Sequence, residues 1–434
     1  MDRKEFSRRR AQLMRSLGRD AIAILPAAPV RTRNGDIEYD YRQDSYFHYL
    51  TGFPEPDAVA VLAPGRAQGE YLLFVRDRDR EREDWDGPRA GPEGAVDDYG
   101  ADDAFPIADI DEILFGLMEG RPKIHYTMGI NEEFDPRVLG WVNALRVEAR
   151  HGTCAPQEIA ALSHLIDDLR LFKSRGEIAA MRRAAEITVG GHRRAMRFAR
   201  PGVFEYEIAA ELIHEFKRHH AEHAYHPVIG GGANTCILHY RDNDQMLRDG
   251  ELLLIDAGCE FDCYAADVTR TFPVGGRFTP PQRAVYEIVL RAQAAAIDKA
   301  RPGNDWNDPH EAAVRVITHG LVEIGLLKGR PARLIKEGAY REFFGHRTGH
   351  WLGLDVHDVG DYKVDGEWRL LEPGMVVTVE PGIYLRPSPK VPKEFWNIGV
   401  RIEDDVWIGA EGPEVLTAAL EKDPDALERL VQAS

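Results

Sequence analysis

The sequence predicts an α/β protein in two parts: an N-terminal α/β domain, residues 1–172, and a larger C-terminal domain, residues 173–434. Two observations support this prediction. Helical and strand-like segments alternate along the first part, the pattern typical of α/β domains. In the second part, one order of helices, strands and acidic residues occurs twice, which predicts two similar halves.

In the N-terminal part, residues 3–17 have helical spacing, and residues 21–25, 58–62 and 71–75 are short apolar strands. Residues 76–103 are charged and rich in glycine and proline, which predicts a long surface excursion. The domain boundary is placed before Ser174, because Ser174 and Glu177 have the spacing of a capping box that opens a helix.

The duplication begins with the tetrapeptide Ala-Arg-Pro-Gly, which separates two predicted helices at residues 199–202 and again at 300–303. A glycine, an apolar strand and an acid follow each helix pair, at residues 250–256 and 374–380. A second strand with a second acid comes next, at Asp267 and at Glu403. The two halves are therefore expected to present a pair of carboxylates each to a shared centre.

Composition excludes several classes of protein. The chain has 434 residues, of which 44% are apolar and 29% charged, as in globular proteins. A net charge of −17 argues against nucleic acid as a partner. No apolar run reaches the roughly 18 residues of a membrane span, and the charged N-terminus does not resemble a signal peptide. Four scattered cysteines make no disulfide framework, so the cytoplasm is the expected location.

Metal-binding side chains recur in the C-terminal part, each inside a short apolar or glycine-punctuated segment. They are Asp256, Asp267, His350, Glu380 and Glu403. An unpaired buried charge costs several kcal/mol or more, so such carboxylates need partners. Four carboxylates and one imidazole are about what two divalent cations require.

This oxygen-rich donor set favours Mn²⁺, Co²⁺, Zn²⁺ or Fe²⁺ over a thiolate zinc site. Cys259 and Cys263 could suggest a metal pair, but the sequence has no second pair, so small buried residues are the favoured interpretation. Two ions about 3.5–4 Å apart can share a hydroxide that is nucleophilic at neutral pH, which indicates metal-assisted hydrolysis.

The histidines divide into two groups. His346, His350 and His357 lie close together with glycines and a tryptophan, which predicts a segment that lines a site. His239 follows three consecutive glycines and has apolar neighbours, so taken alone it fits a core position better than a site. The histidines at 214, 219, 220 and 223 belong to a charged, solvated helix face.

Arg401 stands two residues before Glu403 in a predicted strand and is expected on the same face. Spacing alone leaves two roles open for it. It could orient a ligand carboxylate, or it could form a structural ion pair.

Short motifs around these residues resemble the pita-bread metallopeptidases, and most closely the aminopeptidase P (Xaa-Pro aminopeptidase) family. The C-terminal motifs are LIDAG at 254–258, DVTRT at 267–271, GHWLGLDVHD at 349–358, EPGM at 372–375, VEPG at 379–382 and GVRIED at 399–404. Segments NGD at 34–36, YRQ at 41–43 and LTGF at 50–53 resemble the family's N-terminal domain. The likeness covers nearly the whole chain.

The resemblance implies a pseudo-two-fold pita-bread catalytic domain with two divalent ions, usually manganese, with zinc or cobalt as alternatives. Asp256 would chelate one ion, His350 and Glu380 would serve the other, and Asp267 and Glu403 would bridge the two.

The family also assigns roles to other residues. His239 and His357 would hold the substrate around the scissile bond, and His346 would lie near the leaving group. Glu380 would shuttle the proton, and Arg401 would support a metal ligand.

The implied reaction releases the N-terminal residue of a peptide whose second residue is proline, by attack of the bridging hydroxide. The cousin dipeptidase, prolidase, shares the ligands and is the first alternative; Trp351 and the N-terminal motifs favour aminopeptidase P. A non-catalytic peptide-binding module is the second alternative, and it predicts eroded ligands.

For the N-terminal domain the resemblance implies oligomer contacts, in a homotetramer or dimer, and closure of a neighbour's active site. Asp36 and Trp85 lie in segments that resemble those approaching a neighbour; a loop aspartate and a packing tryptophan remain the alternative interpretation.

Overall fold

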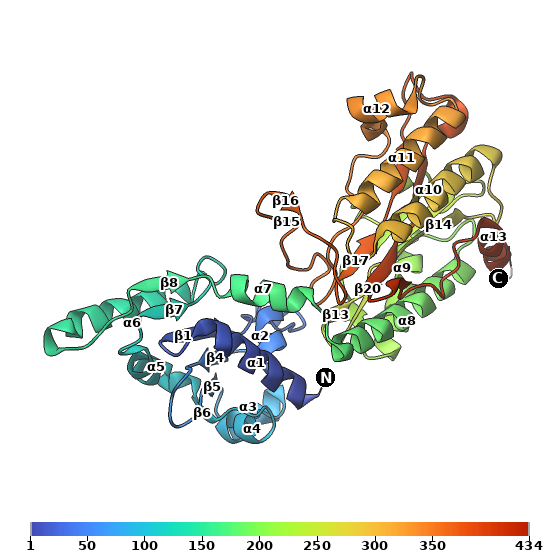
Figure 1. Cartoon of the computed structure of the whole chain (residues 1–434). Helices are drawn as coiled ribbons and strands as arrows, with labels where there is room; N and C mark the ends of the chain where they lie inside the picture. Colours follow the sequence, from blue (N-terminus) through green and yellow to red (C-terminus); the bar gives the residue numbers. More distant parts are fainter. Residues whose placement is uncertain (1, 433–434) are drawn as a thin grey trace. The chain divides into compact units, whose positions relative to one another are not determined.

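The computed structural model describes residues 2–432, and the chain divides into two compact units, residues 1–170 and 171–434 (Figure 1). Each unit has its own hydrophobic core. Among residues 2–432, no helix is long and apolar enough to cross a membrane.

The first unit contains one six-stranded sheet, in the order β6-β5-β4-β1-β7-β8. The strands are β1 (Ala21–Pro26), β4 (Val59–Leu62), β5 (Tyr71–Val75), β6 (Asp103–Pro106), β7 (Lys123–His125) and β8 (Glu158–Ala160). β4 runs antiparallel to both β1 and β5, whereas the β1-β7, β7-β8 and β5-β6 pairs are parallel. Side chains from the central strands, such as Ile24 and Phe74, are fully buried.

The remaining elements of this unit are helices and one short hairpin. They are α1 (Arg3–Leu17), β2 (Thr32–Asn34), β3 (Ile37–Glu38), α2 (Ser45–Thr51), α3 (Arg80–Asp86), α4 (Gly91–Asp97), α5 (Ile110–Met118), α6 (Asp135–Glu148) and α7 (Ser163–Leu171). The predicted first helix and the three predicted strands are confirmed, with strand bounds within one residue. The stretch 76–103 is helical in two places, and α3 has no buried residue.

The second unit repeats one arrangement of helix pair and antiparallel strand pair. In the first half, α8 (Arg175–Phe198) and α9 (Glu205–Arg218) precede β11 (Leu252–Asp256), which pairs with β14 (Thr269–Pro273). In the second half, α10 (Pro280–Lys299) and α11 (Asp308–Glu323) precede β17 (Val376–Val379), which pairs with β20 (Asp404–Gly409). The predicted pseudo-two-fold α/β architecture is therefore present.

Further short strands complete the sheets of this unit. They are β9 (Glu222–His223), β10 (Val228–Gly231), β12 (Cys259–Phe261), β13 (Tyr264–Ala265), β15 (Lys363–Val364), β16 (Glu367–Trp368), β18 (Gly382–Leu385), β19 (Ile398–Arg401) and β21 (Gly412–Val415). Two further helices are α12 (Pro331–Glu337) and α13 (Pro424–Gln432). The β18-β19 pair is antiparallel and brings Gly382 opposite Arg401.

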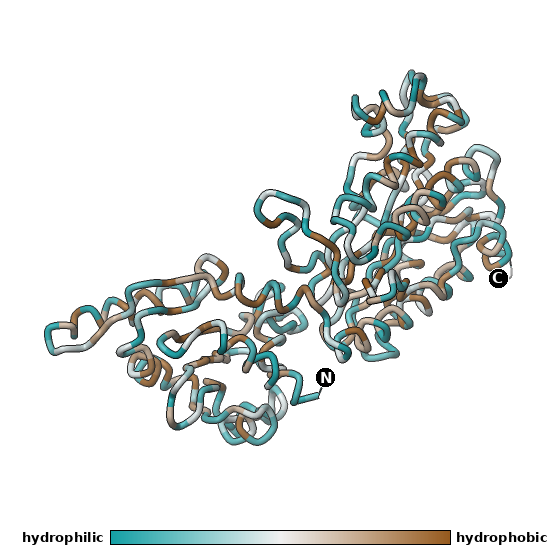
Figure 2. The backbone as a smooth tube through the Cα atoms, viewed as in Figure 1, coloured by the Kyte–Doolittle hydropathy of each residue, from teal (hydrophilic) through white to brown (hydrophobic). Residues whose placement is uncertain are grey.

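Local sequence explains where the long helices begin. The predicted capping box at α8 is present: the Ser174 side chain accepts the Glu177 N–H, and the Glu177 carboxylate accepts the Ser174 N–H at 2.8 Å. Thr279 and Gln282 cap α10 in the same way. Figure 2 shows hydrophobic and hydrophilic residues alternating along these helices, and the hydrophobic ones contribute to one core shared by both halves.

Candidate functional site

The predicted metal-binding residues lie at strand ends in both halves of the second unit. Asp256 is the last residue of β11, and Asp267 lies two residues before β14. Glu380 directly follows β17, and Glu403 lies between β19 and β20. His350 lies in a loop beside β17. The five side chains line one cavity of about 630 Å³.

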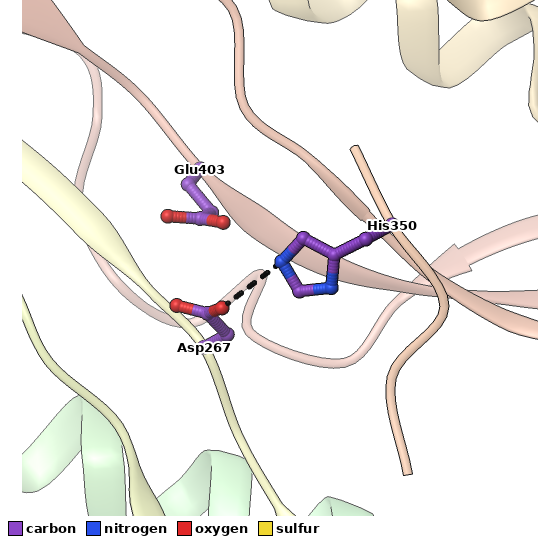
Figure 3. Close-up of side chains that lie close together, drawn as sticks. All are labelled: Asp267, His350 and Glu403. Carbon is purple, nitrogen blue, oxygen red and sulfur yellow. Dashed lines mark ion pairs between the residues drawn. The ribbon is translucent and has the colours of Figure 1, made fainter. Parts of the chain in front are cut away.

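Three of these residues form a tight group that could hold a metal ion. Asp267, His350 and Glu403 each offer a ligand atom, and these atoms all lie within 4.8 Å of one another (Figure 3). His350 Nε2 lies 3.3 Å from Asp267 Oδ2. Burial lowers the pKa of His350, but its contact with Asp267 outweighs this and raises the pKa to about 9.

The carboxylates of Glu380 and Glu403 are buried near other negative charges of the cavity. Glu380 Oε1 lies 3.8 Å from His350 Nε2, and burial raises the pKa of Glu380 to about 7 despite that imidazole. Burial and then the charge of Asp267 raise the pKa of Glu403 well above its usual range. These carboxylates therefore lack enough positive charge around them to ionise easily.

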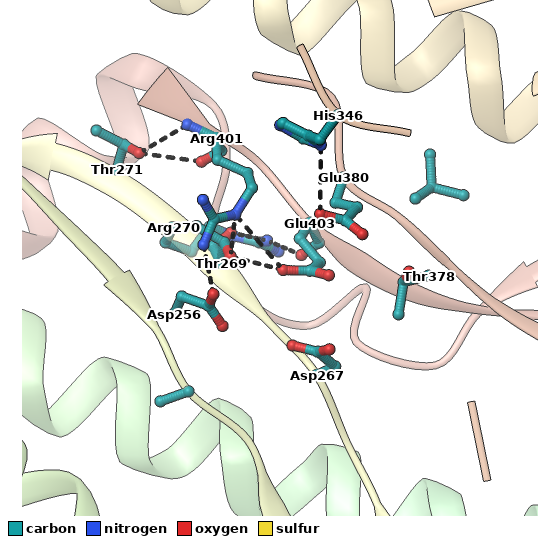
Figure 4. Close-up of polar contacts among 12 residues, drawn as sticks. Asp256, Asp267, Thr269, Arg270, Thr271, His346, Thr378, Glu380, Arg401 and Glu403 are labelled. Atoms are coloured by element: carbon teal, nitrogen blue, oxygen red, sulfur yellow. Dashed lines mark hydrogen bonds and ion pairs between the residues drawn. The ribbon is translucent and has the colours of Figure 1, made fainter. Parts of the chain in front are cut away.

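The Arg401 side chain, at the end of β19 in the second half, points toward Asp256, at the end of β11 in the first half (Figure 4). Its guanidinium donates to Asp256, to Thr269 Oγ1 at 3.0 Å and to Tyr384 Oη at 3.2 Å. Its Nε lies 4.0 Å from Glu403. Arg401 therefore forms an ion pair, and its partner is Asp256, one of the predicted ligand carboxylates.

The donor set fits divalent cations. Carboxylate oxygens with an imidazole nitrogen suit Mn²⁺, Co²⁺, Zn²⁺ and Fe²⁺. The ion pairs recorded for the four carboxylates involve one arginine, Arg401, and the imidazoles of His346 and His350. These partners are fewer than the four carboxylates, which leaves an excess of negative charge that bound cations would offset.

Three further predicted histidines, His239, His346 and His357, line the same cavity. The His357 ring centroid lies 4.4 Å from that of His350. His346 Nε2 lies 2.9 Å from Tyr384 Oη, and its Nδ1 lies 3.8 Å from Glu380. Burial, followed by Arg401, lowers the pKa of His346 to about 4, so this imidazole is neutral at pH 7. His239 is exposed.

The loop that carries His350 and His357 is fixed by a buried ion pair. Lys173 Nζ lies 2.9 Å from Asp358 Oδ2, and each side chain is only 1% exposed. The Asp358 N–H also donates to the Trp351 carbonyl at 2.9 Å. These two contacts hold the segment between Trp351 and Asp358, which contains His357, beside the cavity.

Trp351, next to His350, is fully buried. Its Nε1–H donates to the Gly360 carbonyl at 3.1 Å, and its ring stacks on Tyr362 with centroids 5.5 Å apart. The Trp306 ring packs 4.3 Å away. This aromatic group packs beneath the loop.

Sequence reasoning missed several polar residues of the site. The Tyr225 hydroxyl contacts Asp256 at 2.6 Å and Asp267 at 2.5 Å. Thr269 Oγ1 donates to Glu403 at 2.6 Å. Thr269 follows Asp267 by two residues, so strand periodicity could have placed it on the same face. Tyr225 has no comparable spacing signal.

Comparison with known proteins places this fold and site in a class. The family model "Metallopeptidase family M24" matches residues 179–410, and "Aminopeptidase P, N-terminal domain" matches residues 6–126. The chain belongs to metallopeptidase family M24 and is a hydrolase.

Individual relatives narrow this class further. The chain is 44% identical to the Xaa-Pro aminopeptidase of Escherichia coli K12, over 100% of this chain and 99% of that protein. It is 41% identical to the Xaa-Pro aminopeptidase of Haemophilus influenzae, over 99% and 98%. The Pseudomonas aeruginosa aminopeptidase PepP superposes with a TM-score of 0.99 at 56% identity, covering 100% and 98%. Within M24, it is a member of the aminopeptidase P family.

Proposed function

We propose that this protein removes the N-terminal residue from peptides with proline in second position. The observation that carries this proposal is the group of Asp267, His350 and Glu403, two buried and one half-buried, in a cavity lined by further histidines. Relatives with 44% and 41% identity over almost the whole chain are Xaa-Pro aminopeptidases, which supports the substrate class.

The five acidic and imidazole side chains would hold two divalent ions. Asp256 would serve one ion, His350 and Glu380 the other, and Asp267 and Glu403 would bridge. Mn²⁺ is the proposed metal, with Zn²⁺ and Co²⁺ as alternatives that the same donors accept. When bound, such ions lower the pKa of a shared water, so that a hydroxide nucleophile forms, and polarise the scissile carbonyl.

The protein's own residues orient the substrate and move the proton. Glu380 would accept the proton of the attacking water and deliver it to the proline nitrogen of the leaving peptide. His239 and His357 would hold the substrate beside the scissile bond. His346, held by Tyr384 at 2.9 Å, would lie on the leaving-group side. Arg401 would fix the Asp256 carboxylate through their ion pair.

Proline in second position explains why a dedicated site is useful. The proline nitrogen has no N–H, and its ring restricts its own φ and the preceding residue. A peptidase that recognises an extended backbone through that N–H is poorly suited to this bond. Side chains that act on the carbonyl and the free amino group do not need it.

The N-terminal domain, residues 1–172, is proposed to mediate assembly into a homotetramer or dimer and to cover a neighbour's site, with residues 173–434 as the catalytic domain. Trp85 is 85% exposed, which suits a contact with another copy. Light scattering on the purified protein measures this assembly directly. The cytoplasm remains the proposed location.

The test is hydrolysis by manganese-loaded protein, with a chelated sample in parallel. An Xaa-Pro-Xaa tripeptide, the matching Xaa-Ala-Xaa tripeptide and an Xaa-Pro dipeptide are compared by release of the first residue. Metal-dependent cleavage of the Xaa-Pro-Xaa tripeptide, and not of the Xaa-Ala-Xaa control, is expected. Cleavage of the dipeptide alone would indicate a prolidase, and binding without cleavage would indicate a peptide-binding module.

A further inference from the structure

A buried carboxylate outside the cavity organises the loop that carries His239. Glu205, the first residue of α9, is fully buried. Among residues 2–432, the structure records no basic partner for it. Four donors surround the carboxylate instead, and all come from residues 231–245, the segment that begins at the last residue of β10 and contains His239. They are the Gly231 N–H at 2.7 Å, Asn234 Nδ2 at 3.0 Å, Tyr240 Oη at 2.9 Å and the Gln245 N–H at 2.9 Å.

These donors bracket His239 on both sides. Gly231 and Asn234 precede it, Tyr240 follows it directly, and Gln245 lies at the far end of the loop. The Glu205 N–H also donates to the Gln245 carbonyl at 3.0 Å. The Glu205 carboxylate therefore bonds both ends of this segment, at Gly231 and at Gln245.

Gly231 lies close to both Leu247 and the Glu205 carboxylate. A Cβ added at Gly231 would lie 2.7 Å from the Leu247 side chain and 3.4 Å from Glu205 Oε1. The tighter of these contacts is with the end of the Leu247 side chain, so a larger residue at position 231 would require Leu247 to move.

Within residues 2–432, the structure records no hydrogen bond or ion pair of the His239 side chain. Its side chain is exposed, while the neighbouring Tyr240 is buried and bonded to Glu205. His239 nevertheless lines the cavity and contributes to the lowered pKa values of His346 and His357. Its place near those two rings depends on the path of the loop.

We propose that Glu205 is a positioning residue that clamps residues 231–245 so that His239 faces the substrate. This inference rests on the proposed function, in which His239 holds the peptide. The carboxylate suits the task because each of its oxygens accepts two hydrogen bonds, whereas a carboxamide can accept only at its single oxygen.

Glu205→Gln tests the clamp with almost no change in volume. The new amide N–H would face the Gln245 N–H, a backbone donor that cannot rotate to accept. Glu207→Gln is the matched control because it removes a charge in the same helical turn. Glu207 accepts the Phe204 N–H at 2.8 Å, and a Gln side chain can still accept it. The control separates the clamp from a general effect of charge at the start of α9.

The measurement is kcat and KM of manganese-loaded full-length protein on an Xaa-Pro-Xaa tripeptide, with bound metal counted by elemental analysis. We expect Glu205→Gln to lower kcat/KM about 10- to 100-fold, the scale of a misplacement of about 1 Å. Glu207→Gln should change it less than about 3-fold. Metal content should be unchanged in both variants.

A double-mutant cycle separates positioning from general destabilisation. If Glu205 acts through His239, Glu205→Gln adds no further loss to His239→Ala. Three results would each overturn the proposal. The double mutant could lose kcat/KM by the product of the two single losses, Glu205→Gln could lose bound metal, or Glu205→Gln could keep the kcat/KM of wild type. If Glu205→Gln does not fold, Tyr240→Phe removes one donor only and should lower kcat/KM about 3- to 10-fold in wild type but not in His239→Ala.

A readout independent of catalysis keeps the two proposals distinguishable. In spectra of protein with isotope-labelled histidine, the His239 resonance is assigned by its loss in His239→Ala. It should shift or broaden in Glu205→Gln and stay unchanged in Glu207→Gln. Wild-type protein without activity on any Xaa-Pro peptide would refute the proposed function, whereas an unperturbed His239 resonance would refute the clamp alone.

Discussion

Glu403 and Asp404 are neighbours in the chain, and both are buried, yet their carboxylates lie in opposite surroundings. Glu403 faces the cavity and the other acids, and burial together with Asp267 raises its pKa. Asp404 lies 2.7 Å from both Arg270 and Lys422. Burial raises the pKa of Asp404, but these two cations outweigh it and lower the pKa.

The difference shows which charges the fold satisfies by itself. Successive residues of an extended chain point to opposite faces, so one short segment serves two environments. Asp404 has internal partners and contributes to stability. Glu403 has the Thr269 hydroxyl at 2.6 Å and Arg401 Nε at 4.0 Å, but it faces an excess of negative charge that bound cations would offset. The contrast gives a series of experiments, from the largest expected effect to the smallest.

Glu403→Gln should abolish activity while leaving the fold intact. Loss of a bridging carboxylate removes the charge that would offset two cations, so we expect at least about a 1000-fold fall in kcat, worth about 4 kcal/mol. Bound manganese should fall in parallel. Full activity with full metal content in this variant would contradict the assigned bridging role.

Asp404→Asn should do the reverse and act mainly on stability. Breaking a buried ion pair leaves uncompensated charge on Arg270 and costs about 3–5 kcal/mol. Urea unfolding of the chelated protein measures this loss, with chelated Glu403→Gln as the comparison. If Asp404→Asn lowers the free energy of unfolding by no more than Glu403→Gln does, the proposed difference between the two carboxylates is wrong.

Ionisation of Glu380 should lower the stability of the chelated protein as the pH rises from about 4.5 to about 7, a contribution measured as the difference between wild type and Glu380→Gln. Burial raises the pKa of Glu380 from 4.5 to about 7. Below pH 4.5 the group is protonated in both folded and unfolded protein. At higher pH the unfolded state ionises first, so the free energy of unfolding falls, by on the order of 2 kcal/mol.

Manganese should cancel this pH effect because it binds the ionised carboxylates of the folded state. Urea unfolding at pH 5 and pH 7, with and without metal, measures both results. Glu380→Gln should flatten the slope of the chelated protein. If the slope stays the same in that variant, another group is responsible.

Arg291→Ala should have the smallest effect. Arg291 and Glu323 form an ion pair at 3.1 Å, but their side chains are 56% and 63% exposed. Exposed pairs contribute about 0–1 kcal/mol. Thermal or urea unfolding measures the change in the free energy of unfolding. A loss above about 1 kcal/mol would mean that burial does not explain the difference between this ion pair and the Asp404–Arg270 pair.

The sequence predicted the architecture well because its signals are local and repeated. The capping box at Ser174 and the doubled Ala-Arg-Pro-Gly segments mark helix ends, and the structure has helices there. The strand predicted through Glu403 ends earlier, at Arg401, and pairing resumes at Asp404. Glu403 therefore lies in a connection between strands.

Site residues could be predicted only where a metal-binding or polar side chain occurs in a recognisable sequence pattern. The acids at strand ends could be read from their apolar flanks, and all nine predicted site residues line one cavity. Tyr225 and Glu205 could not be found this way. Each is a single polar residue whose partners lie far along the chain, such as Asp267 for Tyr225 and Gln245 for Glu205. Such pairings follow from tertiary packing and leave no spacing signal.

The buried stack of Trp351 on Tyr362 gives the protein an optical reporter of its own. An indole shielded from water emits at short wavelength and is reached slowly by dissolved quenchers. Because Trp351 adjoins His350, a paramagnetic ion held by that imidazole should quench its emission. The spectrum of the protein minus that of a Trp351→Phe variant would then follow occupancy of the site without any substrate.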